Sequence, residues 1–153
     1  MQAALAFQLA VRAALNQTAD AIDLVRAART QAADLLKRLA DTETTVAKAA
    51  QAVIDASDTI ESRLHNPKAE VVYDILSFPG GAQLYSQLSP LYAFALQSDR
   101  PPPQGQREVF AEQSAELQRL LGETDQLRQG PITALEAALQ TAHIPRLILP
   151  EKK

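Results

Sequence analysis

The two histidines are the first residues to consider as ligands of a metal ion. A di-metal carboxylate site in a helical bundle needs inward carboxylates and a Glu-x-x-His pair on each of two helices. His65 follows Glu61 by four positions rather than three, and His143 has no acidic residue in the preceding turn. The sequence therefore predicts no metal site, and it places both histidines at helix ends near solvent.

Acidic residues could instead act as a general acid and a general base, which requires two carboxyl groups that converge in a cleft. Asp55, Asp58 and Glu61 follow one another at intervals of three, and so do Asp20 and Asp23. Such spacing is typical of solvated helix faces. We therefore expect these acidic side chains to face solvent and to form no catalytic pair.

Nucleophilic and phosphate-binding sites have recognisable local patterns, and the sequence lacks them. It has no cysteine, no Gly-x-Ser-x-Gly elbow, and no Gly-Lys-Ser/Thr after Gly80-Gly81. We predict neither catalytic residues nor a bound cofactor, and we expect the chain not to be an enzyme.

Charge and hydropathy limit the class of partner. The 153 residues include 15 basic and 18 acidic side chains, which gives a net charge of −3. A chain without a basic excess does not attract the phosphate backbone of a nucleic acid or an anionic membrane surface. No apolar run approaches the ~18 residues that a membrane-spanning helix needs. We expect a protein partner, and no binding to nucleic acid or membrane.

The elements that carry these residues are predicted to be helices. All five glycines and all nine prolines lie at or after Pro67, so the preceding residues contain no helix breaker. We predict helices over 3–40 and 43–65, joined by a tight turn near Ala40–Thr42. A single helix of about 60 residues is the alternative, and a small domain would struggle to cover it.

Prolines and glycines divide the rest of the chain into shorter segments. We predict an irregular connection over 66–81, a helix over 82–97 kinked at Pro90, helices over 104–129 and 131–142 separated at Gly130-Pro131, and a loose tail over 146–153. The predicted fold class is all-α: an antiparallel up-and-down helical bundle of four main helices plus a short C-terminal helix, in a single domain over 1–153.

Apolar residues recur every three or four positions and predict which face of each helix is buried. The expected inward residues of the first helix are Val11, Leu15, Thr18, Ile22, Val25, Arg29, Ala32, Leu36 and Leu39. Those of the second helix are Val46, Ala50, Val53, Ser57, Ile60 and Leu64. Those of the later helices are Leu84, Leu88, Leu91, Ala95, Phe110, Leu117, Leu120, Thr124, Leu127, Ile132, Leu135 and Leu139.

Aromatic residues gather between positions 73 and 94. Tyr85 and Tyr92 are seven residues apart, so they lie on one face of a helix, and Tyr73 and Phe78 precede them in the irregular connection. One interpretation is a contact patch for a partner, since aromatic side chains are enriched at interfaces. The other is that these rings close one end of the bundle where the connection packs.

Several segments resemble one known family. Asp74-Ile75-Leu76-Ser77-Phe78-Pro79 is similar to a D-x-L-N-(Y/F)-P stretch, and residues 97–110 are similar to the connector and helix that follow it. Ala134 through Pro145 resembles a closing helix, with His143 in place of a helix-ending Gly, and Ala4-Leu5-Ala6-Phe7 resembles the opening helix. The family is the C-terminal helical region of bacterial BNR/Asp-box (sortilin-like) β-propeller proteins, commonly called glycosyl hydrolases. The resemblance covers nearly the whole chain.

The resemblance implies a non-catalytic accessory or interaction module from the C-terminus of a larger, exported (periplasmic or secreted) protein. Its partner would be the propeller of its own parent chain, another protein or a second copy of this chain. The chain has no Trp and no Ser-x-Asp-x-Gly-x-Thr-Trp box, so any hydrolase activity would reside in the propeller. The alternative is a stand-alone sensor bundle that holds a small ligand between helices near Pro90.

Overall fold

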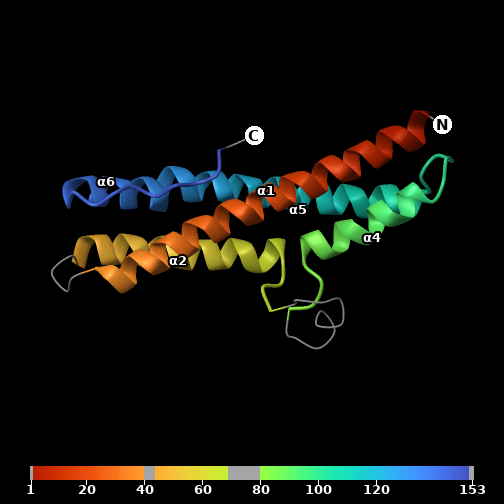
Figure 1. Cartoon of the computed structure of the whole chain (residues 1–153). Coiled ribbons are helices and arrows are strands. Elements are labelled where there is room, and N and C mark those ends of the chain that lie inside the picture. Colours follow the sequence, from red (N-terminus) through yellow and green to blue (C-terminus); the bar gives the residue numbers. More distant parts are fainter. Residues whose placement is uncertain (1, 40–43, 69–79, 152–153) are drawn as a thin grey trace. The chain divides into compact units, whose positions relative to one another are not determined.

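The computed structural model describes residues 2–39, 44–68 and 80–151. Within these ranges the chain is helical and contains no strand, so the predicted all-α helical bundle is confirmed (Figure 1). Its elements are α1 (Gln2–Arg38), α2 (Thr44–Leu64), α4 (Leu84–Leu96), α5 (Gln104–Leu127), the π-helical turn η1 (Arg128–Ile132) and α6 (Thr133–Thr141).

The first 64 residues form two helices rather than one. α1 ends at Arg38 and α2 begins at Thr44, so the single-helix alternative is wrong. The predicted turn near Ala40–Thr42 lies outside the described residues, as does most of the predicted connection over 66–81. Pro90 lies inside α4 as expected.

The chain divides into two compact units. Unit 1 comprises Met1–Ala21 and Ser62–Leu121, and unit 2 comprises Ile22–Glu61 and Gly122–Lys153. α1, α2 and α5 each contribute residues to both units. The single domain over 1–153 stays a prediction.

In unit 1, α4 packs beside the first half of α1 and the first half of α5. Phe7 of α1 meets Phe110 of α5 edge to face, with ring centroids 5.4 Å apart. The Gln8 amide donates a hydrogen bond to the carbonyl of Ala95 at 2.9 Å. These contacts place the start of α1 beside the end of α4 and the start of α5, so α4 runs antiparallel to the other two helices (Figure 1).

In unit 2, the second half of α1 runs antiparallel to α2. Arg26 pairs with Glu61, and Arg29, one turn further along α1, pairs with Asp58, one turn earlier on α2. α4 and α6 bury the residues predicted for them, and α2 buries its predicted residues together with Glu61. In unit 2 the core is formed by the buried residues of α2 up to Glu61 and those of α6, together with residues of α1 that include Val25, Ala28, Ala32 and Leu35.

The buried face of α1 differs from the predicted one. Val11, Thr18, Ile22, Val25 and Ala32 are buried as expected, and Ala21 is buried beside Ile22. At the other predicted positions, Ala14, Ala28 and Leu35 are buried in place of the predicted neighbours. The larger side chains predicted there, Leu15, Arg29 and Leu36, are only half-buried. Small alanine side chains let neighbouring helices approach closely, so the stripe rich in alanine faces inward.

The predicted break between the last two helices is wrong. Helical backbone continues from α5 through η1 into α6, although η1 contains Gly130 and Pro131. Pro131 has no N–H and its ring crowds the carbonyl four residues earlier, which destabilises a regular α-helical turn. The wider turn resolves this, since the Thr133 N–H reaches back five residues to the Arg128 carbonyl.

α6 ends in a Schellman turn at His143. The N–H of Ile144 donates to the Leu139 carbonyl at 2.9 Å, and that of His143 donates to the Gln140 carbonyl at 3.2 Å. His143 has a φ of 56°, the left-handed conformation that usually selects glycine. The turn reverses the chain direction, so the residues after it run back along α6 (Figure 1).

Candidate functional site

The predicted aromatic patch lies partly on α4. Tyr85 is 39% exposed and stacks edge to face on His65, with ring centroids 6.5 Å apart. Tyr92 is half-buried on the same helix. Tyr73 and Phe78 lie outside the described residues. The structure thus brings Tyr85 together with His65, a partner that the sequence analysis missed.

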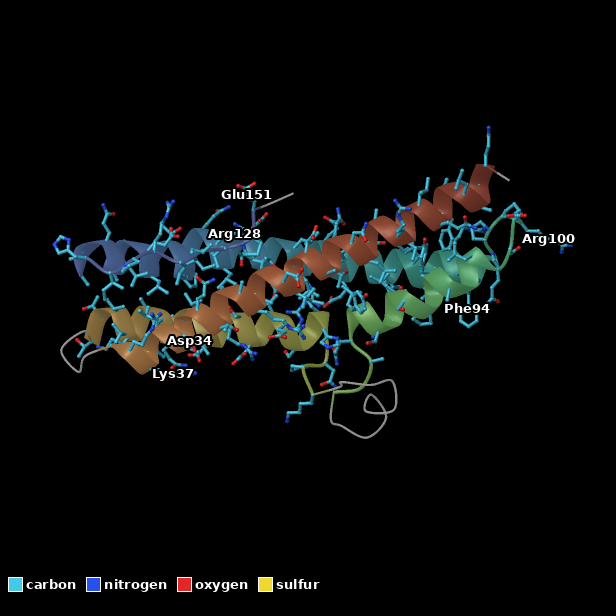
Figure 2. All side chains as sticks on the ribbon, in the orientation of Figure 1. Asp34, Lys37, Phe94, Arg100, Arg128 and Glu151 are labelled. Atoms are coloured by element: carbon cyan, nitrogen blue, oxygen red, sulfur yellow. The ribbon has the colours of Figure 1, made fainter. Side chains whose placement is uncertain are left out.

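Unit 1 exposes more large apolar side chains than its predicted patch contains. Among the described residues, those classed as exposed in unit 1 are Leu5, Leu9, Tyr85, Phe94, Leu96 and Val109. We call this set the unit 1 apolar surface. Phe94 is 57% exposed and points outward from α4 (Figure 2). Among the residues of unit 2 that the structure describes, Ile148 is the one large apolar side chain classed as exposed.

The first three turns of α1 supply an outer face without charge. Its exposed residues are Gln2, Ala3, Leu5, Ala6, Leu9 and Ala10, and the first charged residue of the chain is Arg12. Further along α1 the exposed positions from Asn16 to Arg38 carry polar or charged side chains. A helix normally turns polar residues to water. The start of α1 departs from that rule and therefore needs an explanation.

A hollow of about 200 Å³ adjoins this end of unit 1. Phe7 of α1 and Phe94 of α4 line it together with Arg100 and Pro101–Pro103 of the following connection. Ala95 also lines the hollow, and its carbonyl accepts a hydrogen bond from the Gln8 amide. The hollow offers apolar walls and one guanidinium group.

A carboxylate between two arginines ties α2 to α5 within unit 1. The Arg63 guanidinium donates to Glu116 Oε1 at 3.1 Å, and Arg119 donates to Glu116 Oε2 through its Nε at 3.0 Å. Burial alone would raise the pKa of Glu116, but the hydrogen bonds and charges of Arg119 and Arg63 outweigh it and lower that pKa below its ordinary value of 4.5. This arrangement suits a structural ion pair and not a proton donor.

A second arginine–carboxylate cluster lies within unit 2 and contradicts the expected solvated face of α2. Asp55 and Asp58 are exposed, but Glu61 is only 1% exposed. Arg26 Nε lies 2.5 Å from Glu61 Oε1, and Arg29 Nη1 lies 3.8 Å from Oε2. The buried Ser57, one turn earlier on α2, was a signal that polar side chains enter the core here. Two arginines of α1 compensate the charge of Glu61, so the cluster is an ion-pair contact between α1 and α2.

Within unit 2, the segment 146–150 is hydrogen-bonded to side chains of helical residues, in contrast to the loose tail predicted over 146–153. Gln31 of α1 donates from its amide to the Ile148 carbonyl at 2.6 Å and accepts from the Ile148 N–H at 2.8 Å. Arg128 donates to the Pro150 carbonyl at 2.8 Å, and Leu147 is 8% exposed. The apolar run from Leu147 to Leu149 could have indicated that this segment packs against the protein.

No three His, Asp or Glu side chains in the described ranges are placed to hold a metal ion. None of the helices as described has a stretch long and apolar enough to cross a bilayer. Comparisons with protein-family models, with curated proteins and with solved structures gave no match to this chain.

Proposed function

We propose that this chain is a non-catalytic interaction module from the C-terminus of a larger BNR-type propeller protein, and that the unit 1 apolar surface is its contact face. The observation that carries the proposal is the uncharged outer face at the start of α1. Leu5 is 55% and Leu9 is 49% exposed there, one turn apart on the same helix. Contiguous apolar side chains that face water mark contact sites in folded proteins.

Two neighbouring features support a protein partner over a small ligand. Phe94, Leu96 and Val109 extend the apolar set onto α4 and α5 of the same unit. Large apolar and aromatic anchors contribute most of the binding free energy in protein interfaces. The hollow beside Phe94 is about 200 Å³, which is below the ~300–1,000 Å³ that a drug-sized ligand occupies.

The resemblance to the helical region of propeller proteins supports the choice of partner. It favours the propeller of a parent chain, with another protein or a second copy of this chain as the alternatives. An exported parent follows from the same resemblance. Any hydrolase activity would belong to the propeller.

Site-specific photo-crosslinking in the source organism tests the contact face. Benzoylphenylalanine replaces Leu9 in one variant and Gln17, an exposed polar position of α1, in the matched control. We expect cross-links from position 9 that mass spectrometry assigns to one protein surface, and none from position 17. Equal cross-linking from both positions, or none from position 9, would contradict the proposal.

A ligand-binding bundle is the second candidate, and the hollow beside Phe94 is the observation that favours it. The predicted site was near Pro90, one turn before Phe94 on α4. A ligand that binds the folded chain raises its melting temperature by mass action. A thermal-shift screen in which a compound stabilises the wild-type chain but not Arg100→Ala would support this function.

A further inference from the structure

The side chain of Gln31 forms hydrogen bonds with the backbone of segment 146–150, as the backbone of a neighbouring β-strand would. The side-chain amide of Gln31 presents an N–H donor beside a carbonyl acceptor, the same pair of groups that a backbone residue presents. Both groups bind one residue, Ile148, at 2.6 and 2.8 Å. An antiparallel strand makes the same double contact with the residue opposite it. The contact depends on the backbone and not on the side chain of Ile148, which is 84% exposed.

Side chains of the segment alternate between protein and solvent. Leu147 is buried, Ile148 is exposed and Leu149 is half-buried. This alternation is that of an extended chain, whose successive side chains point to opposite sides. Peptide-binding domains use the same combination, in which main-chain hydrogen bonds give affinity and pockets for alternate side chains give specificity.

Residues of three helical elements form the groove in which segment 146–150 lies. The segment does not fill this groove completely. Arg128 and Ile132 of η1 and Glu136 of α6 form one wall, and Gln31 of α1 faces the segment from the other helix. A hollow of about 370 Å³ remains between that wall and the segment. Arg128 also holds the carbonyl of Pro150, so the groove contacts the segment at both Ile148 and Pro150. Figure 2 shows Arg128 near Glu151, where the segment leaves the groove.

From this geometry we infer that the groove of unit 2 is a binding site for an extended peptide segment, and that residues 146–150 occupy it as an intramolecular ligand. The segment of a partner protein that fits has a leucine-sized side chain followed by a residue with a free N–H and carbonyl. Such a segment displaces residues 146–150 and makes the same contacts with Gln31 and Arg128. This site lies outside the unit 1 apolar surface and does not depend on the function proposed for it.

Two full-length variants allow an open groove to be compared with an occupied one. The first is a double variant of Leu147 and Ile148 that empties the groove, and the second is a control that leaves it occupied. Ile148→Pro combined with Leu147→Asp removes the N–H donor and the buried side chain, so the segment leaves the groove while the helices keep their residues. Ile148→Ser is the matched control, because it keeps the N–H and changes only an exposed side chain. Circular dichroism verifies that both variants retain wild-type helix content.

Fluorescence anisotropy with a labelled peptide of residues 144–151 then measures binding in trans. The tethered segment competes at an effective concentration in the millimolar range, so we expect the double variant to bind the peptide at least about tenfold more tightly than the wild type and Ile148→Ser do. A peptide N-methylated at Ile148 should bind the double variant about tenfold more weakly, because it cannot donate to Gln31. Equal binding to all three chains, or equal binding of the methylated peptide, would overturn the inference. So would dimerisation of the double variant that excludes the peptide.

Hydrogen exchange on the wild-type chain gives a second test that needs no open variant. The Ile148 amide should be protected in the wild type, and its exchange should accelerate in Gln31→Leu. Excess unlabelled peptide should accelerate it as well, because the peptide displaces the segment. An Ile148 amide that exchanges at the rate of an unfolded chain in the wild type would refute the intramolecular ligand.

Discussion

Arg26→Met and Glu61→Gln break the same ion pair, yet they should destabilise the protein to different degrees. The Glu61 side chain is 2% exposed, whereas that of Arg26 is 45% exposed. If the ion pair is broken, water can therefore hydrate the Arg26 guanidinium, but water does not reach the Glu61 carboxylate. Removing the arginine leaves a buried carboxylate, whereas removing the carboxylate leaves a half-exposed guanidinium.

The surroundings of Glu61 set the expected magnitudes. After Arg26→Met, the remaining cation is Arg29, whose Nη1 lies 3.8 Å from Glu61 Oε2 and 3.0 Å from Asp58. Removing one partner of a buried pair costs about 3–5 kcal/mol, and the partial exposure of Arg26 reduces this to about 2–3 kcal/mol. Glu61→Gln keeps the shape and the acceptor oxygen, so we expect a loss of about 1 kcal/mol.

Urea unfolding followed by circular dichroism measures both free energies of unfolding. Lys37→Met is the matched control, because the Lys37–Asp34 pair of the same helix is exposed, with side-chain exposures of 74% and 52% (Figure 2). Its loss should cost less than about 0.5 kcal/mol. Glu61→Gln costing as much as Arg26→Met, or Arg26→Met costing no more than the control, would refute the reasoning.

Three further substitutions probe other positions. His143→Gly should raise the free energy of unfolding in urea by about 1 kcal/mol, because glycine adopts the φ of 56° without steric cost; a less stable variant would contradict this. Ala28→Leu should lower the free energy of unfolding by about 1–3 kcal/mol, because Ala28 is fully buried and a larger side chain does not fit there. The control Ala27→Leu, at a half-buried position, should be nearly neutral. Equal effects of the two substitutions would place Ala28 outside the core. Glu116→Gln should destabilise the protein at about pH 7 and much less at about pH 3, because a lowered pKa gives stability that is present above the unfolded pKa and lost as the pH falls through the folded one. A cost that does not change between these two pH values would show that folding does not lower the pKa of Glu116.

Hydrophobic spacing was sufficient to predict the helices and most of the core. α2 and α4 bury the predicted residues because valine, leucine and isoleucine dominate one face of each helix. α1 offers two candidate stripes that share Val11, Thr18, Val25 and Ala32. The choice between Leu15 and Ala14 depends on how closely the neighbouring helix approaches, which is a tertiary property.

Local rules failed where a tertiary contact or an unusual turn decided the outcome. The pair Gly130-Pro131 would usually end a helix, but here a π-helical turn contains both residues and the helix continues. Glu61 has the spacing of an exposed acid, and its burial depends on Arg26, which lies 35 positions away in the chain. The contact of Gln31 with Ile148 spans 117 positions, so no local pattern could predict it. Of the four predicted patch residues, Tyr85 and Tyr92 lie within the described ranges.

The most direct test of the central claim, that this chain is a module of a larger protein, is an immunoblot. An antibody raised against this domain is applied to fractionated lysate of the source organism. We predict a band far heavier than the 16.6 kDa of this chain, in a periplasmic or secreted fraction. A band at the mass of the chain itself would contradict the claim and favour the stand-alone ligand-binding bundle.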